Sequence, residues 1–157
     1  MNDRSRDARI VNYAIHLSHP MADVVSPEKR SEMMSAIRSK DTKPERTVRS
    51  WLHRNGYRFR NNRKDLPGTP DIVMPKHGTV IFVHGCFWHR HEGCRLAQVP
   101  KSNRDFWEEK FERNIDRDRR NLEECRRAGW KTVVIWECET RDGSFEGKLD
   151  FIQQSSG

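Results

Sequence analysis

Long apolar runs are missing from this sequence of 157 residues. No stretch approaches the roughly 20 apolar residues that a membrane-spanning helix needs, and the first residues lack the apolar segment of a secretory signal. Internal repeats and low-complexity segments are absent as well. Hydrophobic residues make up only 34% of the chain and charged residues another 34%, which allows one modest core. We therefore expect a single cytoplasmic domain.

Cysteine is also scarce, with four residues in the chain. Thiols are kept reduced in the cytoplasm. Four cysteines in that compartment indicate metal ligands or core residues rather than disulfides.

Acidic residues are outnumbered by basic ones, so the formal net charge is +7. A basic surface favours a polyanionic partner, because each lysine or arginine that neutralises a phosphate releases a counterion. The plainer alternative is that the charge only keeps the protein soluble.

The first 25 residues are polar, rich in arginine and without apolar periodicity. We expect residues 1–25 to be a disordered lead and residues 26–157 to form one folded domain. Met21 is an alternative start of the translated chain.

Two helices are predicted at the beginning of this domain. Ser26 followed by Pro27 is typical of a helix start and predicts a helix to about residue 39. Thr42 and Glu45 fit a capping box, which predicts a second helix that ends at Asn55-Gly56. The residues expected on one side of the first helix are Met33, Met34 and Ile37.

Short apolar segments between turns predict the strands, and a long segment of helical periodicity predicts a further helix. The order implies an α/β fold in which helices flank a mixed sheet, with a crossover through the long helix. The predicted strands are Tyr57–Arg60, Asp71–Met74, Thr79–His84 and Trp130–Trp136. The later predicted helices are Asn103–Ala128 and Phe145–Ile152.

Potentially catalytic side chains stand at the ends of two predicted strands. Asp71 opens one strand, where a carboxylate can hold Mg²⁺, although an aspartate after proline can also simply cap a turn. His84 ends the next strand, and His89 follows shortly after it. A histidine near its usual pKa can exchange a proton at neutral pH, or it can be a hydrogen-bonded structural residue.

Asp118 is a charged residue at an expected buried position of the long helix. It falls on the stripe of helical spacing that we expect to be buried, which comprises Trp107, Phe111, Ile115, Leu122 and Cys125. A buried carboxylate is costly unless it is paired or bound. Asp118 could therefore orient a histidine or a metal-bound water, or it could form a salt bridge with a neighbouring arginine.

A compact group of cysteines and histidines suits tetrahedral Zn²⁺. Spacing alone does not choose between His89 and His91 as a ligand. Cys125 lies on the apolar stripe of the long helix, so we assign it to the core. Because the candidate ligands leave no open position for water, the zinc would be structural. The other candidate ligands are Cys86, Cys94 and Cys138.

Together these residues resemble the very-short-patch-repair (Vsr) endonucleases over about residues 26–138. The most specific matches are the run His84-Gly85-Cys86-Phe87-Trp88-His89 and the segment Val134-Ile135-Trp136-Glu137-Cys138. The other matching segments are Met34-x2-Ile37, Asp41-Thr42-x2-Glu45, Pro67-Gly68-x-Pro70-Asp71, Phe106-Trp107-x-Glu109-Lys110, Asn114 and Arg117-Asp118-Arg119-Arg120.

The resemblance implies a restriction-endonuclease-like fold and a magnesium-dependent endonuclease. Such an enzyme nicks one strand of duplex DNA at T:G mismatches, which arise when 5-methylcytosine deaminates. It further implies mismatch-repair proteins and a cognate cytosine-5 methyltransferase as partners, and a bacterial cytoplasmic location at the nucleoid. We expect a monomer.

The resemblance also implies roles for single residues. Asp71 would bind Mg²⁺, and His84 would stand where related nucleases have a lysine. His89 and Asp118 would assist the attacking water, and Glu45 would orient His84 or a water, although Glu45 fits the capping box equally well. The implied zinc ligands are Cys86, His91, Cys94 and Cys138.

Mismatch selection would come from an aromatic wedge. By resemblance, Phe87, Trp88 and Trp107 enter the base stack beside the mismatch, and Met34 and Ile37 press from the opposite groove. A mispair is easier to unstack than a matched pair, so the wedge would favour it. Core packing is the alternative explanation for each aromatic residue.

The chain departs from the family pattern in two places. Val83 stands where the family often has threonine, and the segment from His91 to Cys94 differs in length. Two other functions stay open at this point. One is a zinc-stabilised DNA-binding module without catalysis. The other is a restriction-type nuclease that cuts both strands, although the chain lacks the Glu-x-Lys typical of those enzymes and has Phe82-Val83-His84 there.

Overall fold

The computed structural model of the chain describes residues 40–154. The expected lead, the helix predicted up to residue 39, and with it Met34 and Ile37, lie outside the described residues. The described helices are α2 (Lys43–Arg54), α3 (Arg104–Arg127), α4 (Glu137–Asp142) and α5 (Asp150–Gln154). The strands are β1 (Arg60–Asn61), β2 (Ile72–Met74), β3 (Thr79–His84) and β4 (Lys131–Trp136). Short 3₁₀ helices are η1 (Pro75–His77), η2 (Arg95–Ala97) and η3 (Ser144–Leu149).

The strands form one mixed sheet in the order β1-β2-β3-β4. The first three strands pair antiparallel, whereas β3 and β4 pair parallel in the register Ile81 to Val133. A parallel pair needs a crossover connection, and α3 provides it. The predicted mixed sheet and its crossover helix are confirmed.

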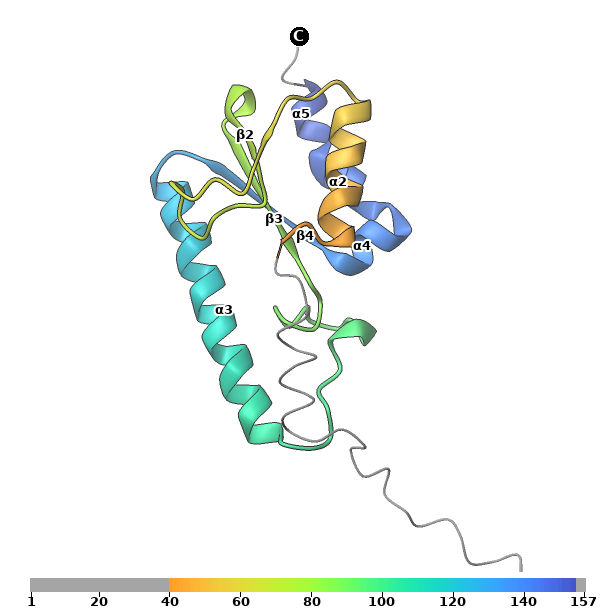
Figure 1. Cartoon of the computed structure of the whole chain (residues 1–157), viewed down its shortest axis with the longest axis vertical. Coiled ribbons are helices and arrows are strands. Elements are labelled where there is room, and N and C mark those ends of the chain that lie inside the picture. Colours follow the sequence, from red (N-terminus) through yellow and green to blue (C-terminus); the bar gives the residue numbers. More distant parts are fainter. Residues whose placement is uncertain (1–39, 155–157) are drawn as a thin grey trace, which may run out of the picture. The chain divides into compact units, whose positions relative to one another are not determined.

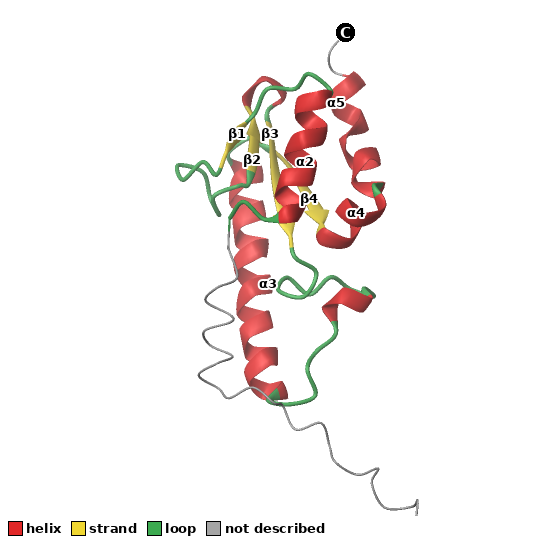
Figure 2. Ribbon diagram, turned by 45° about the vertical axis from the view of Figure 1, so that its right-hand side comes forward, coloured by secondary structure: helices red, strands yellow, loops and turns green. Residues whose placement is uncertain are grey.

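Helices cover both faces of this sheet. Figures 1 and 2 show α3 on one side of the strands and α2, α4 and α5 on the other. Because successive strand residues point to opposite faces, Ile72 and Ile81 pack in the core with α2, while Val73 and Val80 pack against Cys125 of α3. The buried Cys125 therefore belongs to the core, as predicted.

Helix α2 begins as the sequence predicts. The Thr42 hydroxyl accepts from the Glu45 amide, and the Glu45 carboxylate accepts from the Thr42 amide, which completes the capping box. The helix ends at Arg54, with Asn55 as its C-cap before Gly56, whose φ is 79°. Its buried stripe consists of Val48, Trp51 and Leu52.

The apolar stripe predicted on α3 is correct at its two ends and wrong in the middle. Trp107, Phe111 and Cys125 are buried, but Ile115 is exposed to 36%. The side of the helix that faces the protein at this level carries Asn114 and Asp118, which contact a polar loop rather than apolar residues. No helix within residues 40–154 is both long and apolar enough to cross a membrane.

Smaller differences concern the ends of the domain. The strand predicted from Tyr57 to Arg60 is shifted, because Tyr57 and Phe59 pack against the core before β1 begins at Arg60. The predicted helix from Phe145 to Ile152 is divided into η3 and α5, and α4 was not predicted.

Candidate active site and cysteine cluster

One end of the sheet gathers the candidate catalytic residues. Asp71 precedes β2, and its Oδ2 accepts a hydrogen bond from the Val83 amide of β3 at 2.7 Å. His84 ends β3 and is opposite Trp136, the last residue of β4. Because β2 runs antiparallel to β3, its start lies beside the end of β3, as the sequence predicts for Asp71 and His84.

Asp71 lies in an environment that disfavours its charge. Burial raises the pKa of its carboxyl to about 6, against the opposing hydrogen bond from Val83. The nearby carboxylate of Glu45 raises the pKa further. Two acidic groups that lose solvent together favour the binding of a cation between or beside them.

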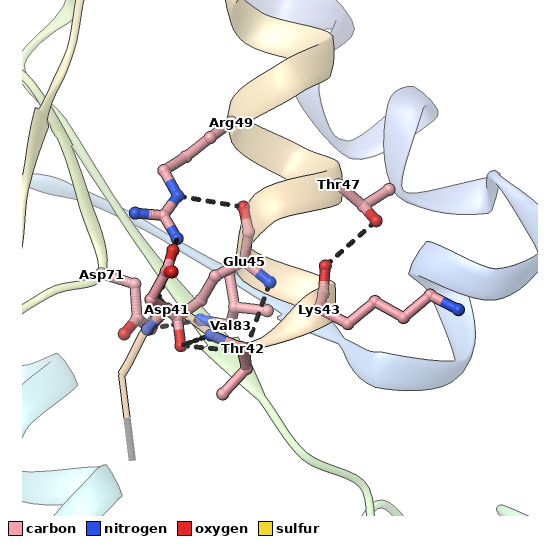
Figure 3. A network of polar contacts seen from close by, with 8 residues as sticks. All are labelled: Asp41, Thr42, Lys43, Glu45, Thr47, Arg49, Asp71 and Val83. Carbon is pink, nitrogen blue, oxygen red and sulfur yellow. Dashed lines mark hydrogen bonds and ion pairs between the residues drawn. The ribbon is translucent and has the colours of Figure 1, made fainter. Parts of the chain in front are cut away.

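Glu45 is held in place by donors at the start of α2. Its side chain is buried, with 3% exposed, and its Oε1 accepts from the Thr42 hydroxyl at 2.9 Å. Its Oε2 accepts from the Asp41 amide at 2.9 Å and lies 3.6 Å from a guanidinium nitrogen of Arg49. Figure 3 shows this network beside Asp71 and Val83. The capping role and the proximity to Asp71 therefore coexist in one carboxylate.

Two histidines stack at the end of β3. The rings of His84 and His89 are 3.9 Å apart and nearly parallel, with 10° between their planes. Burial lowers the pKa of His84 to about 3, and the neighbouring His89 lowers it further. His84 is therefore neutral at physiological pH.

Asp118 of α3 forms a pair with His89. The Asp118 carboxylate contacts His89 Nδ1, and both side chains are partly buried. The predicted alternative of a salt bridge is present only weakly, since an Arg117 nitrogen lies 3.9 Å from the other carboxylate oxygen. A carboxylate on Nδ1 favours the proton there, which leaves Nε2 as an acceptor. Such a pair can take a proton from a water molecule.

The cysteine cluster lies just beyond the same end of the sheet. The ligand atoms of its four members lie within 4.8 Å of one another, and His91 Nδ1 is 3.6 Å from Cys86 Sγ and 3.3 Å from Cys138 Sγ. His91 also stacks on Trp136, with ring centres 4.3 Å apart. His89 belongs to the pair with Asp118, so the geometry selects His91 from the two histidines. The members are Cys86, His91, Cys94 and Cys138.

An aromatic cluster surrounds the first turns of α3. Phe87, Trp88 and Trp107 contact one another, with ring centres 5.1 to 6.2 Å apart. Phe106 joins through Trp107 and is 53% exposed, and Lys110 lies over several of these rings. The Trp107 side chain is only 4% exposed, so it is packed inside the protein.

The Trp107 indole carries an unsatisfied donor. Its Nε1 is buried, and no acceptor within the described residues reaches it. A buried donor without a partner costs about 1–3 kcal/mol.

The turn before Asp71 docks closely on α3. An added Cβ at Gly68 would lie 2.6 Å from the Asn121 side chain, and Gly68 has a φ of 70°. Next to it, the Pro67 carbonyl accepts from the Cys125 thiol at 3.4 Å. Only glycine allows so close an approach. The contact between Gly68 and Asn121 therefore fixes the position of the chain just before Asp71.

Sequence reasoning missed three of these features. It did not single out the Gly68–Asn121 contact, the exposed Phe106, or the hydrogen bond from Asn114 Nδ2 to the Trp88 carbonyl at 3.1 Å. The Gly-x-Pro-Asp run was a usable signal for the first. The other two depend on which side of α3 faces the loop.

We predict that Gly68→Ala lowers the free energy of unfolding more than Gly78→Ala does. Both glycines have a positive φ, but the space around Gly78 is open, so Gly78→Ala measures the backbone strain alone at about 1–2 kcal/mol. Asn121→Gly combined with Gly68→Ala should recover part of the additional loss, because alanine at position 121 would keep the Cβ that lies 2.7 Å from the added Cβ. Denaturant unfolding measures all four proteins, and equal losses for the two glycine variants would contradict the close contact.

Comparison with known proteins identifies the family of this chain. A family model described as DNA mismatch endonuclease Vsr matches residues 22–95. The type II nicking enzyme V.XorIIP of Xanthomonas oryzae pv. oryzae is 54% identical over 137 residues, which cover 87% of this chain and 100% of that protein. The type II nicking enzyme V.NmeAIP of Neisseria meningitidis is 48% identical, over 78% of this chain and 86% of that protein.

The DNA mismatch endonuclease Vsr of Escherichia coli is 43% identical over 121 residues, which cover 77% of each chain. Identities of this size over most of the chain exceed what a shared fold alone produces. The protein therefore belongs to the Vsr family of DNA mismatch endonucleases.

Proposed function

We propose that this protein is an endonuclease that nicks one strand of duplex DNA at a T:G mismatch left by deamination of 5-methylcytosine, and so starts very-short-patch repair. The observation that carries the proposal is the meeting of Asp71, His84 and the His89–Asp118 pair at one end of the sheet. Membership of the Vsr family supports the mismatch as the site of action.

Mg²⁺ is the proposed catalytic cofactor, and Asp71 is its proposed ligand. In the described part of the chain, Asp71 Oδ2 takes the hydrogen bond of Val83, which leaves Oδ1 for a cation. The raised pKa of Asp71 and the proximity of Glu45 fit a hard divalent cation that would stabilise both charges. When bound, Mg²⁺ supplies charge neutralisation at the phosphate and a more acidic water.

The protein's own groups would handle the proton. His89 accepts it at Nε2, and the Asp118 carboxylate stabilises the resulting imidazolium. His84 stays neutral and, through its stacked ring, limits the orientation of His89. Glu45, held by its donors at the helix start, would orient His84 or a water in the same site.

Zn²⁺ is the proposed structural cofactor. Three thiols and one imidazole are ligands that tetrahedral zinc prefers, and all four are supplied by the protein. Burial raises the pKa of the Cys86 thiol to about 12, so a cation would be needed to hold it as a thiolate. The metal would tie the loop after β3 to Cys138 at the start of α4.

The aromatic cluster is the proposed wedge. Phe87 and Trp88 are partly exposed next to the proposed catalytic residues, and Trp107 contacts both of them. Insertion beside a base step costs about a few kcal/mol, and less at a mispair. Met34 and Ile37, outside the described residues, stay proposed contacts from the opposite groove.

The remaining proposals follow from the family. We assign the mixed sheet and its flanking helices to the restriction-endonuclease-like fold. We further propose action in the bacterial cytoplasm at the nucleoid, as a monomer, with a cognate cytosine-5 methyltransferase and mismatch-repair proteins as functional partners.

A nicking assay tests the function directly. The protein should cut one strand of a T:G duplex when Mg²⁺ is present and leave the matched T:A duplex intact. Asp71→Asn should bind the T:G duplex without cutting it, and His89→Gln should cut about 10²–10⁴-fold more slowly because its base is lost. His53→Gln, at an exposed position on α2, is the control.

Binding without cleavage by the unmodified protein would favour the alternative of a zinc-stabilised DNA-binding module. Cleavage of both strands would favour a restriction-type nuclease. Full activity of Asp71→Asn would remove Asp71 from the metal site.

We predict one zinc ion per chain in protein purified without chelator. Cys94→Ser should lose the zinc and lower the melting temperature, because a ligand of the metal is removed. Cys125→Ala is the matched control, since Cys125 lies in the core and should keep the zinc. Elemental analysis measures the zinc content of both variants. Equal zinc loss in the two variants would speak against the cluster as the zinc site.

A further inference from the structure

Three arginines form a row along one edge of α3. Arg113, Arg117 and Arg120 are spaced four and three residues apart, so their side chains leave the helix on the same side. All three are exposed, with 68% of the Arg113 side chain and 56% of the Arg117 side chain open to solvent. Neither the proposed metal site nor the wedge uses them.

The row borders both parts of the candidate site. Asn114, next to Arg113, donates to the Trp88 carbonyl of the aromatic cluster. Asp118, next to Arg117, contacts His89 and lies 3.9 Å from a guanidinium nitrogen of Arg117. A ligand bound to the row would therefore run alongside the wedge and the His89–Asp118 pair.

The surface at this row is hollowed and positively charged. The hollow is lined by four arginines and a single acidic residue, Asp116, so its lining carries a net charge of +3. Arg113 has a partner in Glu109 at 3.3 Å, but both side chains are more than half exposed. An exposed pair of this kind is worth about 0–1 kcal/mol, so a phosphate can replace the glutamate.

The length of the row fits a DNA backbone. The seven residue-to-residue steps of helix from Arg113 to Arg120 rise about 10 Å. One strand of duplex DNA rises about 3.4 Å per phosphate along its axis, and because the strand winds around that axis its successive phosphates are about twice as far apart, so the row can face two or three successive phosphates. The planar guanidinium group binds phosphate oxygens in a bidentate manner.

We propose that Arg113, Arg117 and Arg120 bind the phosphates of the DNA strand that lies along α3 next to the mismatch. This inference rests on the proposed function. Phosphate contacts carry no base sequence but hold the register of the duplex. The row would thus set the position of the scissile phosphate relative to Asp71 without contributing to the choice of T:G over T:A.

The salt dependence of DNA binding tests the row. Affinities of Arg113→Gln, Arg120→Gln and their combination are measured on T:G and T:A duplexes without Mg²⁺, over a range of salt concentrations. Each substitution should reduce the slope of log affinity against log salt by about 0.9 and weaken both duplexes equally. Arg117 is left unchanged because it contacts Asp118.

Arg127→Gln is the matched control. Arg127 lies on the same helix, is exposed, and pairs with Glu123 four residues earlier, as Arg113 pairs with Glu109. The substitution removes the same charge, yet the slope should not change. An unchanged slope in Arg113→Gln and Arg120→Gln, or an equal reduction in Arg127→Gln, would overturn the inference.

Nicking of the T:G duplex by the unmodified protein is measured in parallel. If it nicks normally while the slopes overturn the row, the proposed function stands and only the row is wrong. If it binds with the expected slopes and does not nick, the row is supported and the proposed function fails. If it does not bind duplex DNA at all, both are wrong.

Discussion

The partly buried carboxylate of Asp71 constrains the arrangement of the candidate site. Asp71 lies just before β2, accepts the amide hydrogen bond of Val83, and lies near the buried Glu45. Its charged form is disfavoured there by burial and by the second acid. Keeping such a carboxylate charged lowers the stability of the folded protein unless a cation binds beside it. In the proposed chemistry, the bound cation offsets the free-energy cost of the charged Asp71 carboxylate.

The fold places the other functional groups around this carboxylate with few elements. The antiparallel pairing of β2 and β3 puts Asp71 beside the end of β3, from which the loop with His89 and Cys86 departs. The parallel pairing of β4 brings Cys138 to the same end of the sheet. Helix α3, which connects β3 to β4, contributes Trp107 of the aromatic cluster near its start and then the arginine row, with Asp118 between Arg117 and Arg120.

Features that depend on local sequence were predictable, and those that depend on packing between distant segments were not. The capping box at Thr42 and the buried strand Thr79–His84 follow from spacing and residue type, as do the three cysteines of the cluster, whereas His91 as its fourth member was implied only by the family resemblance. Ile115 was misplaced because helical periodicity assumes that the neighbouring surface is apolar, whereas here it is the loop with His89. The Gly68–Asn121 contact joins residues 53 positions apart, which periodicity cannot reveal.

The most direct measurement of the central claim is the free energy of unfolding as a function of pH, with and without Mg²⁺, for the unmodified protein and Asp71→Asn. The folded pKa of Asp71 lies above its unfolded value of 3.8, so stability is lost as pH rises from about 4 to 6. The stability of the unmodified protein should fall below that of Asp71→Asn by up to about 3 kcal/mol over this range. At neutral pH, Mg²⁺ should recover most of that loss in the unmodified protein alone. Parallel pH curves for the two proteins, or equal stabilisation of both by Mg²⁺, would contradict the proposed metal site at Asp71.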